Sequence, residues 1–188
     1  MKRIERTGLD YQACYCEENV WRLLAGPSLG EMATWAVVVS NTSRNVVVMR
    51  QRSGRPLDGL IHWDYHVFAV AVDPIEGKMA LDLDSDLPFP CPLGRYLRDT
   101  FPSDVQSRIA PRFRVIRGAE YVAELVSDRA HMRRPDGSWI APPPSWPAPG
   151  EGTGKGSNIM EWANMNLRTP GAFYDSARMA AFAGDSIR

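Results

Sequence analysis

Short β-branched segments separated by turn residues constrain the fold of this chain more than any other feature. Two such runs, Trp35–Ser40 and Asn45–Arg50, are separated by Asn-Thr-Ser-Arg and predict a β-hairpin. Ile61–Val72 predicts another strand, and Lys78–Leu83 predicts its partner beyond the turn sequence Asp-Pro-Ile-Glu-Gly. Because strands joined by short turns pair in opposite directions, we expect an antiparallel sheet.

Helical patterns before and after these segments predict helices that flank the sheet. The clearest is Cys16–Ala25, where Val20, Leu23 and Leu24 fall at helical spacing and Gly-Pro ends the pattern. Other short elements are predicted as helices at Gly94–Phe101, Ala119–Leu125, Ile159–Met165 and Ala172–Phe182, and as a strand at Phe113–Ile116. The proline- and glycine-rich residues 135–156 predict a long irregular segment. The expected fold is therefore α/β of the α+β type, in a single domain spanning residues 1–188.

Composition excludes several classes of function. The chain has 22 Lys and Arg against 22 Asp and Glu, which gives no electrostatic basis for binding nucleic acid or an anionic membrane. No apolar run is long enough to span a bilayer, and no secretory signal is visible. Three cysteines without such a signal favour reduced thiols. We therefore expect a cytoplasmic protein, with a monomer as the simplest state.

The spacing of the cysteines argues against a metal site. Cys14 and Cys16 are separated by one residue, whereas structural zinc sites use two to four and need a second ligand pair. Neither the remaining cysteine, Cys91, nor the three histidines supply such a pair. A disulfide between Cys14 and Cys16 would be strained. We expect no metal, no disulfide and, for Cys91, a buried apolar role.

Cys16 instead has the position of a nucleophile. It lies in the first turn of a predicted helix, where unpaired backbone N–H groups and the helix dipole favour a thiolate. The same N–H groups are suited to hold an oxyanion formed by attack on a carbonyl. A cysteine nucleophile also needs a base and a group that orients it.

An imidazole and a carboxylate with suitable spacing lie on the predicted strand pair. His66 and Asp82 are sixteen residues apart. Because directly opposed residues of an antiparallel pair share a face, a turn near residue 74 or 75 places His66 opposite Asp82 or Asp84. A carboxylate there would fix the imidazole tautomer. Each residue also has a plainer interpretation, as a buried thiol, a core histidine or an exposed aspartate.

Longer motifs around these residues resemble one known family, the protein N-terminal glutamine amidohydrolases. The motifs follow the order of that family from about residue 11 to 165, which is most of the chain. They are C-Y-C-E-E-N-V-W (14–21), W-D-Y-H-V (63–67), D-L-D-S-D-L-P-F-P-C (82–91), F-R-V-I-R (113–117), S-D-R-A-H-M (127–132) and P-P-P-S-W-P (142–147).

This resemblance implies a papain-like or transglutaminase-like cysteine-hydrolase core with an antiparallel sheet and flanking helices. It also implies a triad of Cys16, His66 and Asp82, and so selects Asp82 over Asp84. The implied reaction is deamidation of the side chain of an N-terminal glutamine to glutamate, with release of ammonia. The implied partners are proteins or peptides with N-terminal glutamine, and the chemistry needs no cofactor.

Recognition of a terminal residue requires a group that binds its free α-ammonium. Carboxylates near the nucleophile are the candidates: Glu17, Glu18, Asp64 and Asp84. Of these we favour Glu18, and we expect Trp63 and Trp146 to line the substrate cleft. Three alternative functions remain open at this point: an internal-glutamine deamidase, a cysteine protease of related fold, and a non-catalytic module that binds protein N-termini.

Overall fold

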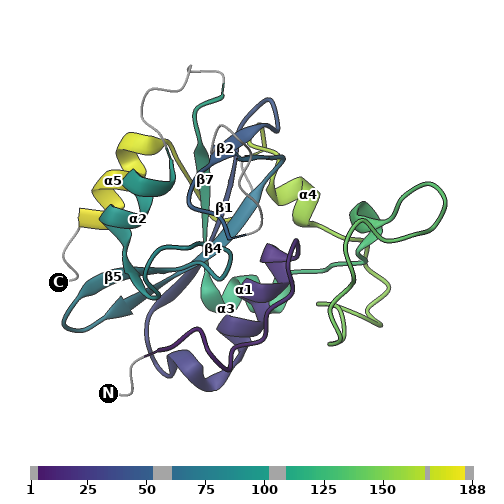
Figure 1. The fold of residues 1–188 in the computed structure, drawn as a ribbon, viewed down its shortest axis with the longest axis horizontal. Coiled ribbons are helices and arrows are strands. Elements are labelled where there is room, and N and C mark those ends of the chain that lie inside the picture. Colours follow the sequence, from purple (N-terminus) through teal and green to yellow (C-terminus); the bar gives the residue numbers. More distant parts are fainter. Residues whose placement is uncertain (1–3, 53–60, 102–108, 168–169, 185–188) are drawn as a thin grey trace.

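The computed structural model describes residues 4–52, 61–101, 109–167 and 170–184, which are built around a six-stranded sheet (Figure 1). The strand order is β6-β5-β4-β1-β7-β8, and every neighbouring pair is antiparallel. Its strands are β1 (Thr34–Ser40), β4 (His66–Asp73), β5 (Gly77–Leu81), β6 (Cys91–Pro92), β7 (Arg112–Arg117) and β8 (Ala172–Tyr174). A separate two-stranded sheet pairs β2 (Val46–Val48) with β3 (Ile61–Trp63).

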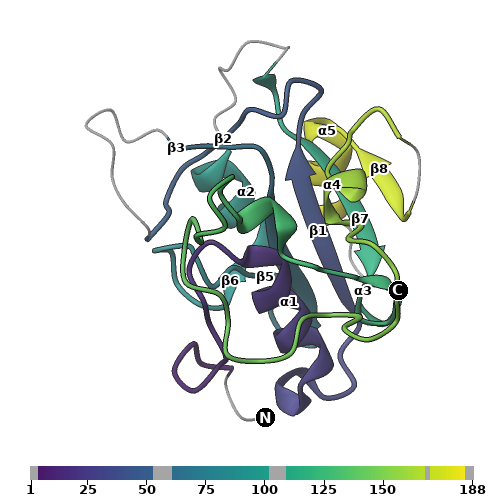
Figure 2. The same ribbon diagram turned by 90° about the vertical axis from the view of Figure 1, so that its right-hand side faces the viewer.

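Helices cover both faces of the large sheet. They are α1 (Cys16–Ala25), α2 (Leu93–Thr100), α3 (Gly118–Glu124), α4 (Ile159–Trp162) and α5 (Ser176–Gly184), with 3₁₀ turns η1 (Pro27–Leu29) and η3 (Ala130–Met132). In Figures 1 and 2, α1 and α3 lie on one side of the central strands, and α2 and α5 lie on the other. The expected antiparallel sheet with flanking helices is confirmed.

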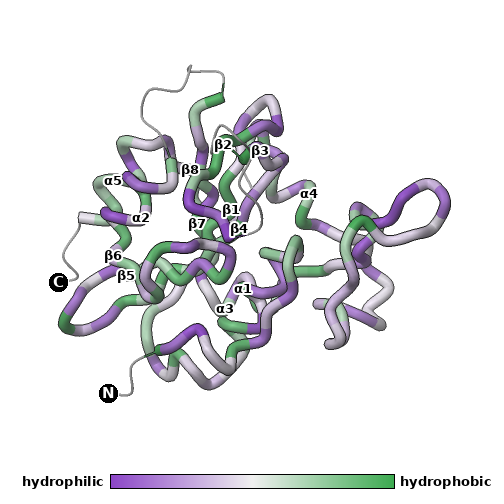
Figure 3. The backbone as a smooth tube through the Cα atoms, viewed as in Figure 1, coloured by the Kyte–Doolittle hydropathy of each residue, from purple (hydrophilic) through white to green (hydrophobic). Residues whose placement is uncertain are grey.

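The side-chain alternation of the central strands supplies two hydrophobic cores. Along β4, Val67 and Ala69 pack toward α1 and α3, whereas Phe68 and Val70 pack toward α2 and α5. Because both faces are buried, these strands read as nearly continuous apolar runs. Apolar residues accordingly concentrate in the strands, while the loop that follows η3 is hydrophilic (Figure 3).

Two predictions about the first strands were wrong. β1 does not form a hairpin with β2: it lies in the middle of the large sheet, between β4 and β7, while β2 pairs with β3. The predicted single strand Ile61–Val72 is two strands in different sheets, since the chain leaves the ladder at Asp64-Tyr65. That break lies directly before His66 and places it at the start of β4.

The last part of the chain was also predicted incorrectly. Ala172–Phe182 is not one helix, because residues 172–174 form the edge strand β8 on β7 and the helix begins at Ser176. Asp175 marks the change, with Oδ1 accepting the backbone N–H of Arg178 at 2.8 Å. The helix predicted at Ile159–Met165 is shorter and ends at Trp162. The helix predicted at Cys16–Ala25 is confirmed with the same bounds.

A buried arginine holds the segment after α4 against the sheet. Arg114, in the middle of β7, has no exposed surface, and its guanidinium donates to four backbone carbonyls. These belong to Trp162, Asn164, Leu167 and Pro170, at 2.7–3.2 Å.

The helices of the described residues are too short or too polar to span a bilayer.

The predicted irregular segment runs between α3 and α4 and lies against α1. Figure 2 shows it passing alongside that helix. The Tyr15 hydroxyl, directly before α1, donates to the Ala141 carbonyl at 3.2 Å. Arg129 donates to the carbonyls of Pro144 and Trp146 at 3.3 and 2.9 Å. The proline-rich chain is therefore attached to the helix that carries Cys16.

Candidate active site

The first residue of α1 is Cys16, and its position is fixed by contacts of the preceding loop. Asn19 faces that loop, where its Oδ1 accepts the Gln12 N–H and its Nδ2 donates to the Gln12 carbonyl, both at 2.8 Å. Cys14 adopts a left-handed conformation with φ of 68°, which turns the chain sharply into the helix. Two cysteines separated by one residue thus lie at one helix terminus, with Cys14 exposed and Cys16 partly buried.

His66 and Asp82 meet at the end of the β4–β5 ladder. The last regular pair is Ala69 with Leu81, so a continued ladder would place Asp84 opposite His66. The chain leaves β5 after Leu81 instead, and the Asp82 side chain reaches diagonally to His66. Nε2 of His66 lies 3.0 Å from Oδ2 of Asp82, and both side chains are almost completely buried.

The carboxylate of Asp82 accepts further hydrogen bonds that fix its orientation. The Tyr96 hydroxyl, from α2, donates to Oδ2 at 2.8 Å, and the Gln51 side-chain amide donates to the same atom at 3.4 Å. The backbone N–H of Asp84 donates to Oδ1 at 2.9 Å. With both oxygens held in this way, Asp82 is a rigid acceptor that fixes the ring of His66.

The Asp82 carboxylate stabilises the imidazolium that forms when His66 takes up a proton. Burial lowers the pKa of His66, but the Asp82 carboxylate and its hydrogen bond outweigh burial and leave that pKa raised. Burial raises the pKa of Asp82, but His66, Tyr96 and the backbone N–H of Asp84 leave it lowered. The pKa of the Cys16 thiol is raised well above its ordinary value by burial and by nearby Glu17 and Asp84. Burial and these two carboxylates therefore favour the neutral thiol over the thiolate at Cys16.

Glu17 lies inside the protein beside that thiol. Its side chain is fully buried, and the Cys16 thiol lies 3.7 Å from its Oε2. Its Oε1 lies 3.6 Å from Nε2 of His131, whose ring is 3.3 Å from the Tyr65 hydroxyl. Burial, opposed in part by hydrogen bonds to a backbone N–H, Tyr65 and Cys16, raises the pKa of Glu17 to about 7. His131 is thus part of the surroundings of Cys16 and lines the same pocket.

Glu18 lies on a different face of α1 and is already paired. Arg129 donates to its two oxygens at 2.8 and 2.7 Å in a bidentate ion pair, and the Trp146 indole N–H donates at 3.0 Å. The Glu18 carboxylate is fully buried in this pair. Three N–H donors and the Arg129 charge already hold the Glu18 carboxylate, so this geometry does not favour the prediction that Glu18 binds the substrate ammonium.

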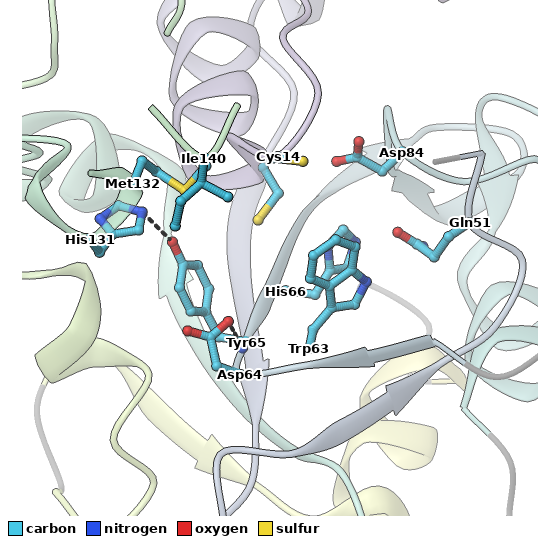
Figure 4. Close-up of a pocket in the computed structure, with 11 residues that line it drawn as sticks. Cys14, Gln51, Trp63, Asp64, Tyr65, His66, Asp84, His131, Met132 and Ile140 are labelled. Atoms are coloured by element: carbon cyan, nitrogen blue, oxygen red, sulfur yellow. Dashed lines mark hydrogen bonds between the residues drawn. The ribbon is translucent and has the colours of Figure 1, made fainter. Parts of the chain in front are cut away.

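A pocket of about 220 Å³ opens beside Cys16 and His66 (Figure 4). Of the other predicted site residues, Trp63, Asp64 and Asp84 line it, whereas Glu17, Glu18 and Trp146 do not. Figure 4 shows His131 and Tyr65 on one side, Asp84 and Gln51 on the other, and His66 between them. Asp64 is exposed, and its Oδ1 accepts the backbone N–H of Tyr65.

Several residues of this site were not found from the sequence. Tyr96 and Gln51 contact Asp82 from segments 14 and 31 residues away, and Arg129 contacts Glu18 across 111 residues. Pairings of this kind depend on tertiary structure and leave no local spacing signal. Within the described residues, no group of three or more His, Cys, Asp or Glu is arranged to hold a metal ion.

The fold and this site together define a class of protein. An α+β core with a six-stranded antiparallel sheet is compatible with a hydrolase, and a thiol at a helix terminus shares one pocket with an imidazole bonded to a carboxylate. The model of the N-terminal glutamine amidase family matches residues 11–183 of the chain. The protein belongs to that family of hydrolases, which act on amides.

Curated relatives support the same membership. The chain is 46% identical over 143 residues to the protein N-terminal glutamine amidohydrolase of Drosophila melanogaster, covering 73% of this chain and 70% of the relative. The proteins of the same name in Drosophila grimshawi and Drosophila pseudoobscura pseudoobscura are 47% identical over 146 and 143 residues, with the same coverage. The family resemblance inferred from the motifs is confirmed.

Proposed function

We propose that this protein deamidates the side chain of an N-terminal glutamine in proteins and peptides, giving glutamate and ammonia. Membership of the family supports the substrate. The observation that carries the mechanism is the 3.0 Å contact of His66 with Asp82, in the pocket that Cys16 also lines. We further propose that the chain acts as one domain, as a monomer, in the cytoplasm, and without metal or cofactor.

The first chemical step is attack of the Cys16 sulfur on the side-chain amide carbon. Nε2 of His66 faces Asp82, so Nδ1 is the ring nitrogen left to receive the thiol proton. The raised pKa of His66 favours that transfer, whereas the raised pKa of Cys16 opposes it. The thiolate therefore forms as attack proceeds. The backbone N–H of Cys16, at the first position of α1, is a donor for the oxyanion that develops.

The second half of the reaction uses the same groups in reverse. His66 gives its proton to the amide nitrogen as the carbon–nitrogen bond breaks, and ammonia leaves behind a thioester on Cys16. His66 then takes a proton from water, whose oxygen attacks the thioester carbon, and the thiol is restored as glutamate departs. Asp82, held by Tyr96, keeps the ring oriented throughout.

Ammonia release from three peptides tests this proposal. We expect release from a peptide that begins with glutamine, and none from one that begins with asparagine, because its shorter side chain misplaces the amide relative to Cys16. We also expect none from an N-acetylated glutamine peptide. Release from the acetylated peptide would instead indicate an internal-glutamine deamidase. Cleavage of the chain would indicate a protease, and binding without turnover would indicate a recognition module.

Two cysteine variants test the nucleophile separately. Cys16→Ala should abolish ammonia release while the protein still folds. Cys14→Ala is the matched control, because Cys14 lines the same pocket two residues away and is expected to leave the rate within a few-fold of the parent. Retention of activity by Cys16→Ala, or its loss in Cys14→Ala alone, would refute the assignment of the nucleophile.

A further inference from the structure

One side of the pocket carries two hydrogen-bond acceptors with free capacity. Asp84 is only 6% exposed, and its Oδ1 accepts the Tyr11 hydroxyl at 2.7 Å. Gln51 is 4% exposed, and its Oε1 is buried without a hydrogen-bond partner in the described residues. Both side chains line the pocket on the same side of His66 (Figure 4). An unpaired buried acceptor is costly, so it marks a place where a donor is missing.

The orientation of the Gln51 amide follows from its neighbour. Its Nε2 lies 3.4 Å from Oδ2 of Asp82 and donates to it. Exchanging the amide nitrogen and oxygen would bring Oε1 against that carboxylate, where two acceptors repel. Gln51 therefore presents oxygen, not nitrogen, on its other side.

The charge at this side of the pocket favours a cation. Asp64 and Asp84 both line the pocket, whereas none of the described residues that line it is a lysine or an arginine. Arg52 is close to Asp84 but donates to the Leu83 carbonyl at 3.2 Å and stacks on the Tyr11 ring. Within the described part of the chain, Asp84 thus has no ion-pair partner within 4 Å.

We infer that Asp84 and Gln51 bind the α-ammonium group of the N-terminal glutamine, and so restrict the enzyme to terminal residues. This inference rests on the proposed function and assigns one part of that site. His66 and Arg52 act on Asp84 only at longer range, whereas an ammonium would supply a cation in direct contact with it. The same ammonium would supply the N–H donors that Gln51 Oε1 lacks. A neutral side-chain amide would supply only the donors.

Substrate geometry agrees with this position. In glutamine, three carbon atoms separate the α-nitrogen from the amide carbon, so the ammonium site must lie in the same pocket as Cys16. Asp84 meets that requirement, and its charge is also close enough to raise the pKa of the Cys16 thiol. Neutralisation of Asp84 by an ammonium then removes one of the negative charges that oppose the thiolate. Binding of a free N-terminus thereby assists activation of the nucleophile.

The other predicted carboxylates are less suited to this role. Glu18 is already paired with Arg129, and Glu17 has no exposed surface and does not line the pocket. Asp64 lines the pocket but is exposed to solvent, where a single ion pair stabilises little. Asp64 is therefore the alternative that the experiment must exclude.

The test compares two substrates that differ only in the α-amino group. One is a peptide that begins with glutamine, and the other carries a 5-amino-5-oxopentanoyl cap, which is glutamine without its α-nitrogen. Both pass through the same chemistry at Cys16 and His66, so an effect on the chemical step cancels in the ratio of their kcat/KM values. That ratio is measured for the parent and for Asp84→Asn, Gln51→Met, Asp64→Asn and Asp86→Asn.

We expect Asp84→Asn to lower the preference for the free amine by roughly ten- to a hundredfold, as for a hydrogen bond to a charged group. Gln51→Met should lower it by roughly two- to tenfold. Asp86→Asn is the control, because Asp86 lies in the same loop and pairs with Arg50 instead. Equilibrium binding of the same two peptides is also measured in proteins that carry Cys16→Ala. In that background too, Asp84→Asn should reduce the preference for the peptide with the free amine.

Three results would overturn the inference. In the first, Asp84→Asn reduces turnover of both substrates equally, which would assign Asp84 to the chemistry or to the side-chain amide. In the second, the preference is lost in Asp64→Asn and kept in Asp84→Asn. In the third, the parent does not prefer the free amine. By contrast, a parent that releases no ammonia from either peptide refutes the proposed function itself, and this inference with it.

Discussion

The buried carboxylate of Glu17 leads to a prediction that does not depend on catalysis. Glu17 has no exposed surface, and its Oε1 lies 3.6 Å from Nε2 of His131. Burial raises its pKa to about 7 from an ordinary value of 4.5. Glu17→Gln keeps the size and shape of the side chain while removing the charge. The free energy of unfolding of the parent and the variant should therefore differ in a pH-dependent way.

The sign and size of the difference follow from proton linkage. Between pH 4.5 and 7 the folded parent holds a proton on Glu17 that the unfolded chain releases, so folding of the parent weakens as the pH rises through this window. At about 1.4 kcal/mol per pKa unit, the loss approaches about 3 kcal/mol by pH 8. The glutamine variant does not titrate at this position. Its stability relative to the parent should thus rise by about 3 kcal/mol from pH 4 to pH 8.

Urea denaturation of both proteins at half-unit steps from pH 4 to pH 8.5 measures this difference. Contributions of the other titrating groups are common to both proteins and cancel to first order. A difference in the free energy of unfolding that is the same at every pH reports only how well the new amide packs. Glu124→Gln, on the exposed surface of α3, controls for loss of one negative charge. A difference curve that is flat across the pH range would refute the raised pKa of Glu17.

Three further substitutions test single contacts. Tyr96→Phe removes the hydroxyl that donates to Asp82 inside the protein. It should lower kcat/KM about tenfold in steady-state kinetics and the free energy of unfolding by about 1.5–3 kcal/mol in urea. Arg129→Met leaves the Glu18 carboxylate buried without its cation, and should lower the free energy of unfolding, measured in urea, by about 3–5 kcal/mol. An unchanged free energy would show that the Trp146 indole alone is enough to stabilise the buried carboxylate. Arg114→Met leaves four carbonyls without their donor, and should destabilise by at least about 3 kcal/mol in the same assay.

Local patterns in the sequence predict the positions of helices and strands well, but they do not predict which strands pair. The helix at Cys16–Ala25 and the paired strands around Asp73–Gly77 could be predicted because each depends on residues that are close in the chain. The partners of Trp35–Ser40 could not, since a strand buried on both faces is an unbroken apolar run that carries no information about which strands lie beside it. The boundary between β8 and α5 at Asp175 depends on the pairing of β8 with β7, which the sequence pattern of Ala172–Phe182 does not indicate.

The site was predictable to the same extent. Even spacing indicated that His66 and Asp82 share a face, although a regular register favours Asp84, and only the departure of the chain after Leu81 brings Asp82 to the ring. Nothing in the sequence indicated that Gln51 and Tyr96 complete the surroundings of Asp82. Contacts across the two cores depend on how the sheet is ordered, and that order was the part of the fold that local patterns did not determine.

The hairpin of β4 and β5 has the candidate site at one end and a highly exposed apolar side chain, Ile75, at the other. His66 begins β4, whereas Asp73 ends it and caps the turn by accepting the backbone N–H groups of Ile75 and Glu76 at 2.8 and 2.9 Å. About 23 Å of strand lies between the two ends. Ile75, at the tip, is 90% exposed. This turn is therefore a suitable attachment point, because an epitope or fluorophore placed there lies at the end of β4 opposite His66.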